Sequence, residues 1–218
     1  MITSTTSNTP IACYYGGPEE STPGVSEIEI DGVVQPTTKN EYLFETTGEH
    51  VVKYTLTDTT AIPGYCFASC YNIVNMTIPN SVTSIGNCAF IACSSLTNIT
   101  IPDSVTSIGN SAFMNCSSLA SMTIGSGVTS ISERNFKNCS SLTSVIIPDN
   151  ITSIMSYAFE DCSGLTSITT LAVTPPTLNT IPFYNTNNCP IYVPAASVDA
   201  YKAAWTYYSS RIQAIPTA

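Results

Sequence analysis

By length, the chain of 218 residues fits one continuous domain with small additions at its ends. Charged residues make up 10% of it, against about 25% in a typical soluble domain, so Ser, Thr and Asn must supply most of the polar surface. The formal net charge is −9, which disfavours nucleic-acid binding because such binding needs Lys and Arg to neutralise phosphates. No stretch approaches the roughly 18 consecutive apolar residues of a membrane span, and residues 1–5 lack the basic and apolar segments of a signal peptide.

The first part of the chain is expected to form a tail and a cap. Residues 1–23 are polar, contain three prolines and are expected to be a flexible tail or tether. Between residues 26 and 56, alternating apolar residues flank two hairpin signals, one at Asp31-Gly32 and one around residues 46–49. We therefore interpret residues 24–57 as an acidic β-hairpin cap.

From residue 58 the sequence is dominated by a unit of 23 residues. The cysteine of the unit recurs at Cys70, Cys93, Cys116, Cys139 and Cys162, and the phenylalanine three residues before it recurs at Phe67, Phe90, Phe113, Phe136 and Phe159. One such unit cannot bury its own apolar face, so the core must form by stacking unit on unit. The repeat therefore predicts a solenoid over residues 58–172.

Within one unit the apolar spacing predicts a strand and a return. Leu96, Ile99 and Ile101 follow the pattern L-x-x-L-x-L, whose last step has the period of a strand, and Pro102 ends it because proline cannot donate to a ladder. The inward-facing residues that follow, up to Phe113, lie in a stretch too short and too rich in Gly and Ser for a full helix, so a 3₁₀ or single-turn segment is expected. Each coil is thus one parallel strand and a short 3₁₀ or helical return.

These runs carry a resemblance to a known family. Residues 101–109 (IPDSVTSIG) and 112–119 (AFMNCSSL) resemble the BspA-type leucine-rich repeat of bacterial surface proteins, and the resemblance covers roughly residues 54–172. It implies a leucine-rich-repeat solenoid located on a cell surface or outside the cell. Three positions depart from the pattern, and we expect local adjustments of packing there without loss of a coil: Gly125-Ser126-Gly127, Ser132 and Thr170.

Residues 173–218 are expected to form a C-terminal cap made of a strand and a helix. Residues 191–193 are interpreted as a closing strand, and a helix is expected at about residues 197–209, with Ser197 as its N-cap. The only tryptophan, Trp205, is expected to anchor this cap. The segment also resembles the terminal cap of many BspA-type proteins.

The sequence contains little that could carry catalysis or bind a metal. Its single histidine, His50, lies on the expected hairpin cap, far from the regular cysteines with which it would have to form a nucleophilic pair. Cys66 with Cys70 and Cys88 with Cys93 loosely suggest zinc ligands, but the repeat itself accounts for Cys70 and Cys93. No phosphate-binding glycine loop is present. We therefore expect no enzymatic activity, no cofactor and no metal.

The five regular cysteines are expected to be buried thiols. Side chains stacked in register do not easily reach the torsion of near 90° that a disulfide needs. A small apolar side chain also packs well at such a position. The state of four other cysteines stays open at this stage: Cys13, Cys66, Cys88 and Cys189.

The x positions of the strands are expected to face a concave surface. This face is small, uncharged and rich in hydroxyls, and solenoids use such surfaces as platforms for a partner. Alternatively, threonine is there merely as a soluble residue that favours strands. The candidate partner-binding residues are Thr97, Asn98, Thr100, Ser121, Thr123, Thr143, Ser144, Ile146, Thr166, Ser167 and Thr169.

Three functions are therefore considered. The resemblance implies an extracellular or cell-surface protein-binding or adhesion module that recognises a protein or glycan on a host or neighbouring cell. The alternative is a passive structural spacer or scaffold domain of a surface protein. An ice-binding array along the threonine ladder is weaker, because Ile146 interrupts the ladder and a solenoid curves. No nucleic acid and no membrane span are expected.

Overall fold

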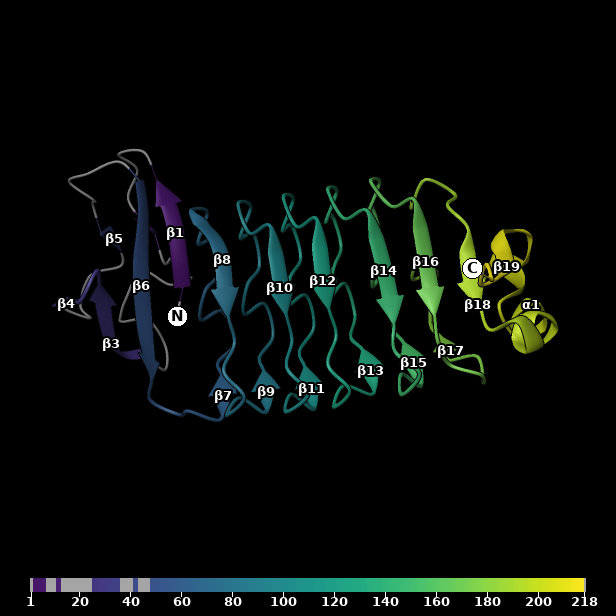
Figure 1. Ribbon diagram of the computed structural model, residues 1–218, viewed down its shortest axis with the longest axis horizontal. Coiled ribbons are helices and arrows are strands. Elements are labelled where there is room, and N and C mark those ends of the chain that lie inside the picture. Colours follow the sequence, from purple (N-terminus) through teal and green to yellow (C-terminus); the bar gives the residue numbers. More distant parts are fainter. Residues whose placement is uncertain (1, 7–10, 13–24, 36–40, 43–47, 218) are drawn as a thin grey trace.

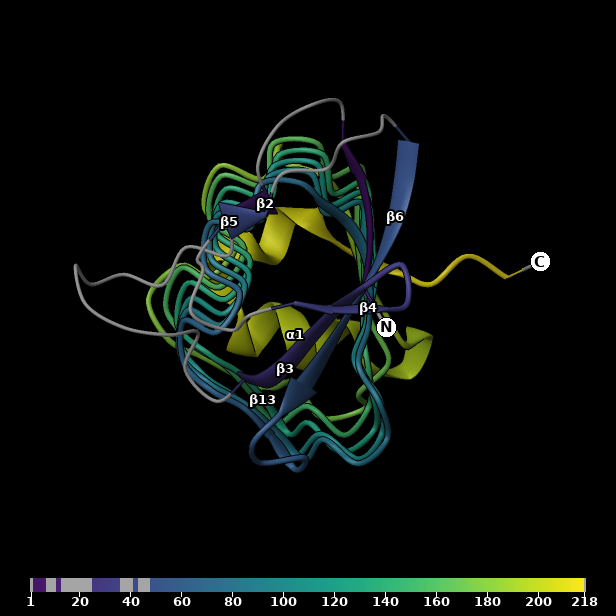
Figure 2. The same cartoon turned by 90° about the vertical axis from the view of Figure 1, so that its left-hand side faces the viewer.

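The computed structural model describes residues 2–6, 11–12, 25–35, 41–42 and 48–217. Within these ranges the chain forms an elongated stack of coils with a β cap at one end and a helical cap at the other (Figure 1). Viewed along the stack, the coils superimpose with the same outline (Figure 2). Cys13 and most of the tail expected before residue 24 lie outside the described residues. The predicted leucine-rich-repeat solenoid is confirmed.

One side of the stack is a ladder of parallel strands, one from each coil. Except at one interruption, neighbouring strands pair in register one repeat apart, as in Asn98 with Ser121 and Ser144 with Ser167. This is the parallel strand that the apolar spacing predicts. The strands are β8 (Ile73–Thr77), β10 (Asn98–Thr100), β12 (Ser121–Thr123), β14 (Ser144–Ile147), β16 (Ser167–Thr170) and β18 (Ile191–Val193).

A second parallel ladder, which the sequence analysis did not predict, runs along another side of the stack. Each of its strands is two residues long, usually Ser-Ile, with the isoleucine turned into the core in the first five. The strands are β7 (Ala61–Ile62), β9 (Ser84–Ile85), β11 (Ser107–Ile108), β13 (Ser130–Ile131), β15 (Ser153–Ile154) and β17 (Thr177–Leu178).

The return of each coil is built from turns, and not from the expected 3₁₀ or helical segment. Residues 60–192, all of which are described, contain no helix. Two residues of every return have positive φ and break the helical path: Tyr65, Cys88, Ser111, Arg134 and Tyr157 at one position, and Ser69, Ala92, Asn115, Asn138 and Asp161 at the other. Backbone bonds from coil to coil, such as Phe67 N–H to the Ala89 carbonyl at 2.8 Å, join the returns into a third ladder.

The core is a continuous column of aromatic rings that the returns hold in line. From Phe67 through Phe90, Phe113, Phe136 and Phe159 to Phe183, successive ring centroids lie 5.1–5.6 Å apart and the planes differ by at most 17°. The ring of Tyr54 closes one end of the column, 5.1 Å from Phe67. Because Phe183 continues it, the stack extends one coil beyond residue 172, where the sequence analysis placed the end of the repeats.

Both strand ladders are interrupted at the same place. Strand β12 pairs with β10 but not with β14, and β13 pairs with β15 but not with β11. The connection between β12 and β13 contains the first departure from the repeat, where a Cβ on Gly127 would lie 2.3 Å from the Asp103 carbonyl oxygen. Glycine therefore allows a close approach of two backbones here. The third ladder is uninterrupted, since Phe113 N–H donates to the Asn135 carbonyl at 2.9 Å.

The N-terminal cap is an antiparallel β-structure joined to the first coil. Strand β6 (Gly48–Leu56) pairs with β3 (Val25–Ile30), which pairs in turn with β4 (Val33–Gln35) across the predicted Asp31-Gly32 turn. On its other edge β6 pairs with β1 (Ile2–Thr6), and β1 also pairs with β8. Residues 2–6 are thus a strand rather than the expected tail. A separate pair is formed by β2 (Ile11–Ala12) and β5 (Glu41–Tyr42).

The C-terminal cap closes the other end of the stack with short helices and a last strand. The prediction of a single helix at about residues 197–209 is wrong. The chain instead forms a 3₁₀ turn at Ala195–Ser197, α1 (Val198–Ala204), a second 3₁₀ segment at Thr206–Arg211 and β19 (Ile212–Ala214). The α-helix ends because Trp205 has ψ of 58°. Ser197 makes no side-chain capping bond.

Trp205 anchors this cap, as its position on the apolar face predicts. The indole is 2% exposed, packs 5.9 Å from the ring of Phe183 and donates to the Pro176 carbonyl at 2.9 Å. Tyr201 lies beside it and bonds to Thr170 at 3.1 Å and to the Ala172 carbonyl at 2.8 Å. These bonds explain why a threonine can occupy the inward position 170, where the other coils have apolar residues.

Candidate functional site

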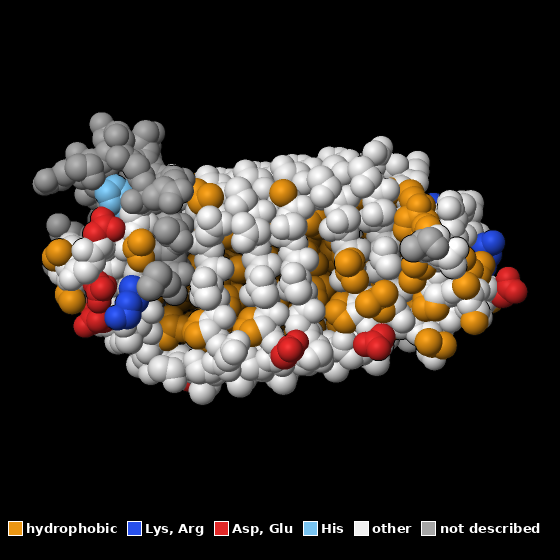
Figure 3. All heavy atoms as spheres, in the orientation of Figure 1, with side chains coloured by type: hydrophobic (Ala, Val, Ile, Leu, Met, Phe, Trp, Pro, Cys, Tyr) orange, Lys and Arg blue, Asp and Glu red, His pale blue; other side chains and the backbone are white. Residues whose placement is uncertain are grey.

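The candidate residues lie on the outer side of the strand ladder, which we call the strand face. They form three rows, each defined by one x position of the strand pattern. Row 1 contains Val74, Thr97, Ala120, Thr143 and Thr166; row 2 contains Asn75, Asn98, Ser121, Ser144 and Ser167; row 3 contains Thr77, Thr100, Thr123, Ile146 and Thr169. Most of these side chains are exposed, and the half-buried ones are Val74, Asn75, Thr97, Ser167 and Thr169. In Figure 3 this face has few charged side chains along the coils.

The hydroxyls of row 1 are used to hold the coils together. Thr97 donates to the Val74 carbonyl at 3.1 Å, and Thr166 donates to the Thr143 carbonyl at 2.9 Å. Thr143 makes the same contact, at 3.4 Å, with the carbonyl of Ala120. These hydroxyls already donate to backbone carbonyls of the preceding coil, so they are less available to a partner.

Rows 2 and 3 present groups that a partner can reach. The amide of Asn98 donates to the Asn75 amide oxygen at 2.7 Å, which fixes the orientation of both side chains. In row 3 the hydroxyls of Thr100 and Thr123 are exposed, and within the described chain they make no hydrogen bond. Row 3 is therefore a line of hydroxyls held by a rigid backbone, interrupted by the exposed side chain of Ile146.

The C-terminal part of the strand face is more apolar than the sequence analysis suggested. Ile146 is 60% exposed, and two residues shortly after the end of β16, Leu171 and Val173, are 44% and 71% exposed. Hydrophobic side chains are also more frequent toward this end in Figure 3. Sequence reasoning missed Leu171 and Val173 because it assigned neither to a repeat position on the displayed face. Such apolar groups add to a binding site where they lie next to one another on a surface.

The single histidine has a structural partner on the cap hairpin. Nδ1 of His50 lies 2.6 Å from Oδ2 of Asp31, and Oδ1 of the same carboxylate accepts the Val51 N–H at 2.9 Å. The hydrogen bond from His50 and that from the backbone hold the pKa of Asp31 below its usual value. This pair fixes the turn between β3 and β4.

The regular cysteines lie in the core with their thiols in contact with the neighbouring coil. Each of four thiols donates to the carbonyl of a phenylalanine in the preceding coil, at 3.0–3.3 Å, and the donors are Cys93, Cys116, Cys139 and Cys162. Burial raises the pKa of Cys139 well above its usual value. The described cysteines, including Cys66, Cys88 and Cys189, form no disulfide. The described ranges contain no cluster of three or more His, Cys, Asp or Glu that could hold a metal.

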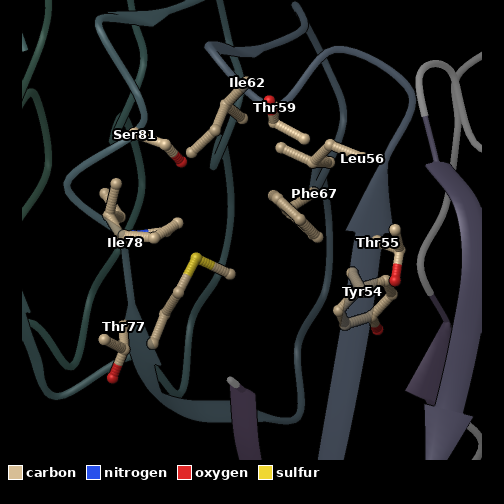
Figure 4. A pocket seen from close by; sticks show the side chains of 11 residues that line it. Tyr54, Thr55, Leu56, Thr59, Ile62, Phe67, Thr77, Ile78 and Ser81 are labelled. Carbon is tan, nitrogen blue, oxygen red and sulfur yellow. The ribbon is translucent and has the colours of Figure 1, made fainter.

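A pocket that the sequence did not reveal lies between the N-terminal cap and the first coil (Figure 4). Its volume is about 220 Å³, and apolar side chains such as Leu56, Ile62, Phe67 and Ile78 line most of it. It forms because the first coil has no coil before it: Tyr54 covers Phe67, while the neighbouring apolar residues are covered less completely. This arrangement could hold a small apolar group.

Comparisons with known proteins agree with the fold and with the repeat. The sequence model of the family described as BspA type leucine rich repeat region matches residues 60–192 in 6 copies. No curated protein matches the chain. Among the helices of the part of the chain that the structure describes, none is long and apolar enough to cross a membrane.

Three solved structures illustrate the similarity. A leucine rich cell surface protein from Faecalibacterium prausnitzii is 34% identical with a TM-score of 0.54, over 60% of this chain and 34% of that one. A leucine rich repeat protein from T. pallidum is 26% identical with a TM-score of 0.59, over 72% of this chain and 80% of that one. A leucine-rich repeat protein from Eubacterium ventriosum is 28% identical with a TM-score of 0.52, over 65% of this chain and 41% of that one.

Proposed function

The chain belongs to the BspA-type leucine-rich-repeat family, and from this premise we propose that it is an extracellular or cell-surface recognition module without enzymatic activity. Its partner on this proposal is a protein on a host or neighbouring cell. Two findings support a surface location: the family is that of BspA-type repeats, and one similar structure is described as a cell surface protein.

The observation that carries the proposal is the exposed, hydrogen-bond-competent row 3 beside an apolar end. Thr100 and Thr123 offer hydroxyls that the described part of the chain does not use, and the exposed side chains of Ile146, Leu171 and Val173 offer apolar area. The backbone beneath is held by ladders and by the aromatic column, so little conformational entropy is lost when a partner binds. A face without charges selects its partner by shape and hydrogen bonds rather than by electrostatic attraction.

The passive spacer is the second candidate, and one feature of the strand face favours it. The three rows contain no Tyr, Trp or Arg, the residues that usually dominate the energy of an interface. If the domain is a spacer, the threonines of row 1 need no partner to explain them, because their hydroxyls join neighbouring coils.

The experiment that tests the proposal uses two long, charged side chains in row 3. The labelled protein is first applied to epithelial cells and to immobilised fibronectin, fibrinogen and laminin to find a surface that it binds. Thr100→Arg combined with Thr123→Arg should then abolish that binding, because both side chains project into the contact and would bury unpaired charge. The melting temperature should change little, since both sites are exposed.

The control is Thr106→Arg, an exposed site immediately before β11 and outside the three rows. It should leave binding unchanged. Normal binding by the double variant would refute the strand face as the binding surface. Failure of the unmodified protein to bind any of the surfaces would favour the spacer.

A further inference from the structure

We infer that the C-terminal end of the molecule contains a second, separate binding site, a groove for a saccharide that carries a carboxylate. The groove lies between the last coil and the 3₁₀ segment at Thr206–Arg211 and has a volume of about 800 Å³. This volume falls in the range of roughly 300–1,000 Å³ that is usual for small-molecule sites. Four tyrosines, three amides and one arginine are among the residues that line it.

Exposed tyrosine rings give the groove the surface that sugar rings stack on. Tyr207 is 69% exposed and Tyr184 is 47% exposed, although large aromatic side chains usually lose most of their exposure in a folded domain. A tyrosine offers an apolar ring for the C–H groups of a sugar and a hydroxyl for its oxygens. The two rings lie on different elements, Tyr184 in the last return and Tyr207 in the 3₁₀ segment, so they flank the groove.

The platform is rigid before any ligand arrives. Tyr208 is 2% exposed, and its hydroxyl accepts the Phe183 N–H at 3.1 Å. The ring of Tyr207 rests edge-on against it, with centroids 5.0 Å apart and planes at 83°. Because its neighbour is fixed in the core, the ring of Tyr207 loses little freedom on binding.

The arginine is also fixed, and it supplies the groove with positive charge. Residues three apart in a 3₁₀ segment lie on one face, which places Arg211 over the ring of Tyr208, 5.4 Å from its centroid. Its Nε donates to the Cys189 carbonyl at 2.8 Å and its Nη2 to the Thr186 hydroxyl at 2.9 Å. Nη2 also lies 3.5 Å from the Cys189 sulfur, and within the described residues Nη1 makes no hydrogen bond, so it is the nitrogen available to a ligand.

The chemistry of the remaining lining selects the class of ligand. Arg211 is the one charged residue among those that line the groove, and no carboxylate is among them. The amides of Asn188 and Gln213 are exposed and make no hydrogen bond within the described chain. Amides and tyrosines suit the hydroxyls of a sugar, while a guanidinium prefers a carboxylate. An acidic saccharide uses all of these groups.

The test measures the binding of 3′-sialyllactose and of lactose to the whole chain by saturation-transfer NMR and calorimetry. We expect saturable binding of both, tighter for 3′-sialyllactose because its carboxylate meets Arg211. Tyr207→Ala should weaken the binding of both by about tenfold or more through loss of stacking. The matched control is Tyr71→Ala, which removes a tyrosine that is 51% exposed at the far end of the solenoid, and it should bind like the original protein.

Two results would overturn the inference: no saturable binding of either saccharide, or unchanged binding by Tyr207→Ala. Arg211→Lys keeps the positive charge but loses the planar guanidinium with its fixed N–H donors, so it should reduce the preference for 3′-sialyllactose over lactose. An unchanged preference would refute the role of the arginine. The variant with Thr100→Arg and Thr123→Arg should bind both saccharides normally, so failure of the strand-face proposal and failure of this one are distinguishable.

Discussion

At the scale of single residues, the cysteines show why one residue type recurs in a buried position. Each S–H of four successive coils points at the carbonyl of a phenylalanine in the preceding coil, as in Cys116 to Phe90 at 3.2 Å. Alanine would fill the same space less well and donate nothing, and serine would bury a more polar group. The thiol therefore serves packing and a weak hydrogen bond at once.

This arrangement predicts slow reaction of the buried thiols. Cys93, Cys116 and Cys139 are fully buried, and a thiol reagent needs both access and the thiolate form. We expect these three to remain unlabelled in the native protein and to react together on denaturation. Mass spectrometry of labelled peptides gives the readout. Rapid labelling of Cys116 in the native protein would contradict its buried position.

A second single-residue prediction concerns Asn135, which stands where Ala89, Ala112 and Ala158 stand in other coils. Its side chain is fully buried, and its amide nitrogen and oxygen have no partner in the described chain. A buried polar group without a hydrogen bond costs about 1–3 kcal/mol. Asn135→Ala should therefore raise the free energy of unfolding by about 1 kcal/mol, measured by urea denaturation.

The comparison variant for Asn135 is Asn138→Ala in the same coil. The amide of Asn138 donates to Asn115 at 2.7 Å, and its φ of 61° disfavours alanine. This variant should be less stable than the original protein. If Asn135→Ala were also less stable, the asparagine would have a stabilising role that the contacts do not explain.

At the scale of the structural element, the aromatic column and the turns around it depend on one another. Each return holds its phenylalanine by a backbone bond to the next coil, and each ring packs between two others. The rings of Phe113 and its neighbour Phe136 are 5.4 Å apart and parallel to within 1°. This contact also spans the place where both strand ladders are interrupted, so the column and the returns join the two halves there.

Phe113→Ala should therefore lower the free energy of unfolding by about 3–5 kcal/mol, as large-to-small changes in a core do. The two neighbouring rings are fixed by their own returns and cannot close the cavity. Urea denaturation gives the value, with Tyr71→Ala as the exposed control, expected to change stability by about 0.5 kcal/mol or less. A loss of less than about 1 kcal/mol for Phe113→Ala would be inconsistent with a continuous column.

At the scale of the whole molecule, the continuous column predicts that the solenoid unfolds as one unit. The single tryptophan, Trp205, packs against the last ring of the column, so its fluorescence reports on the C-terminal end. Far-UV circular dichroism reports on all the strands. The two urea transitions should coincide, because each coil is stabilised by its neighbours. An earlier transition of the fluorescence would mean that the C-terminal cap unfolds separately.

The repeat phase and the strand of each coil could be predicted from the sequence, because Phe, Cys and Leu recur in buried positions at constant spacing. The left-handed turn positions could not, since residues such as Tyr65, Cys88 and Arg134 occupy them instead of glycine. The short Ser-Ile strands are too short to show a period of two. The C-terminal groove could not be predicted either, because it depends on how Tyr207 and Arg211 meet the last coil.

The regular advance of the column, 5.1–5.6 Å from ring to ring, has a consequence for how such molecules change over generations. Every coil offers the next one a phenylalanine ring and a return that pair in the same way. A recombination event that removed residues 94–116 would join Cys93 to Ser117, stack Phe90 on Phe136 and leave both ends as they are. The length of the molecule can therefore change by whole coils. The C-terminal groove would stay the same, but its distance from the N-terminal cap would shrink or grow by one coil at a time.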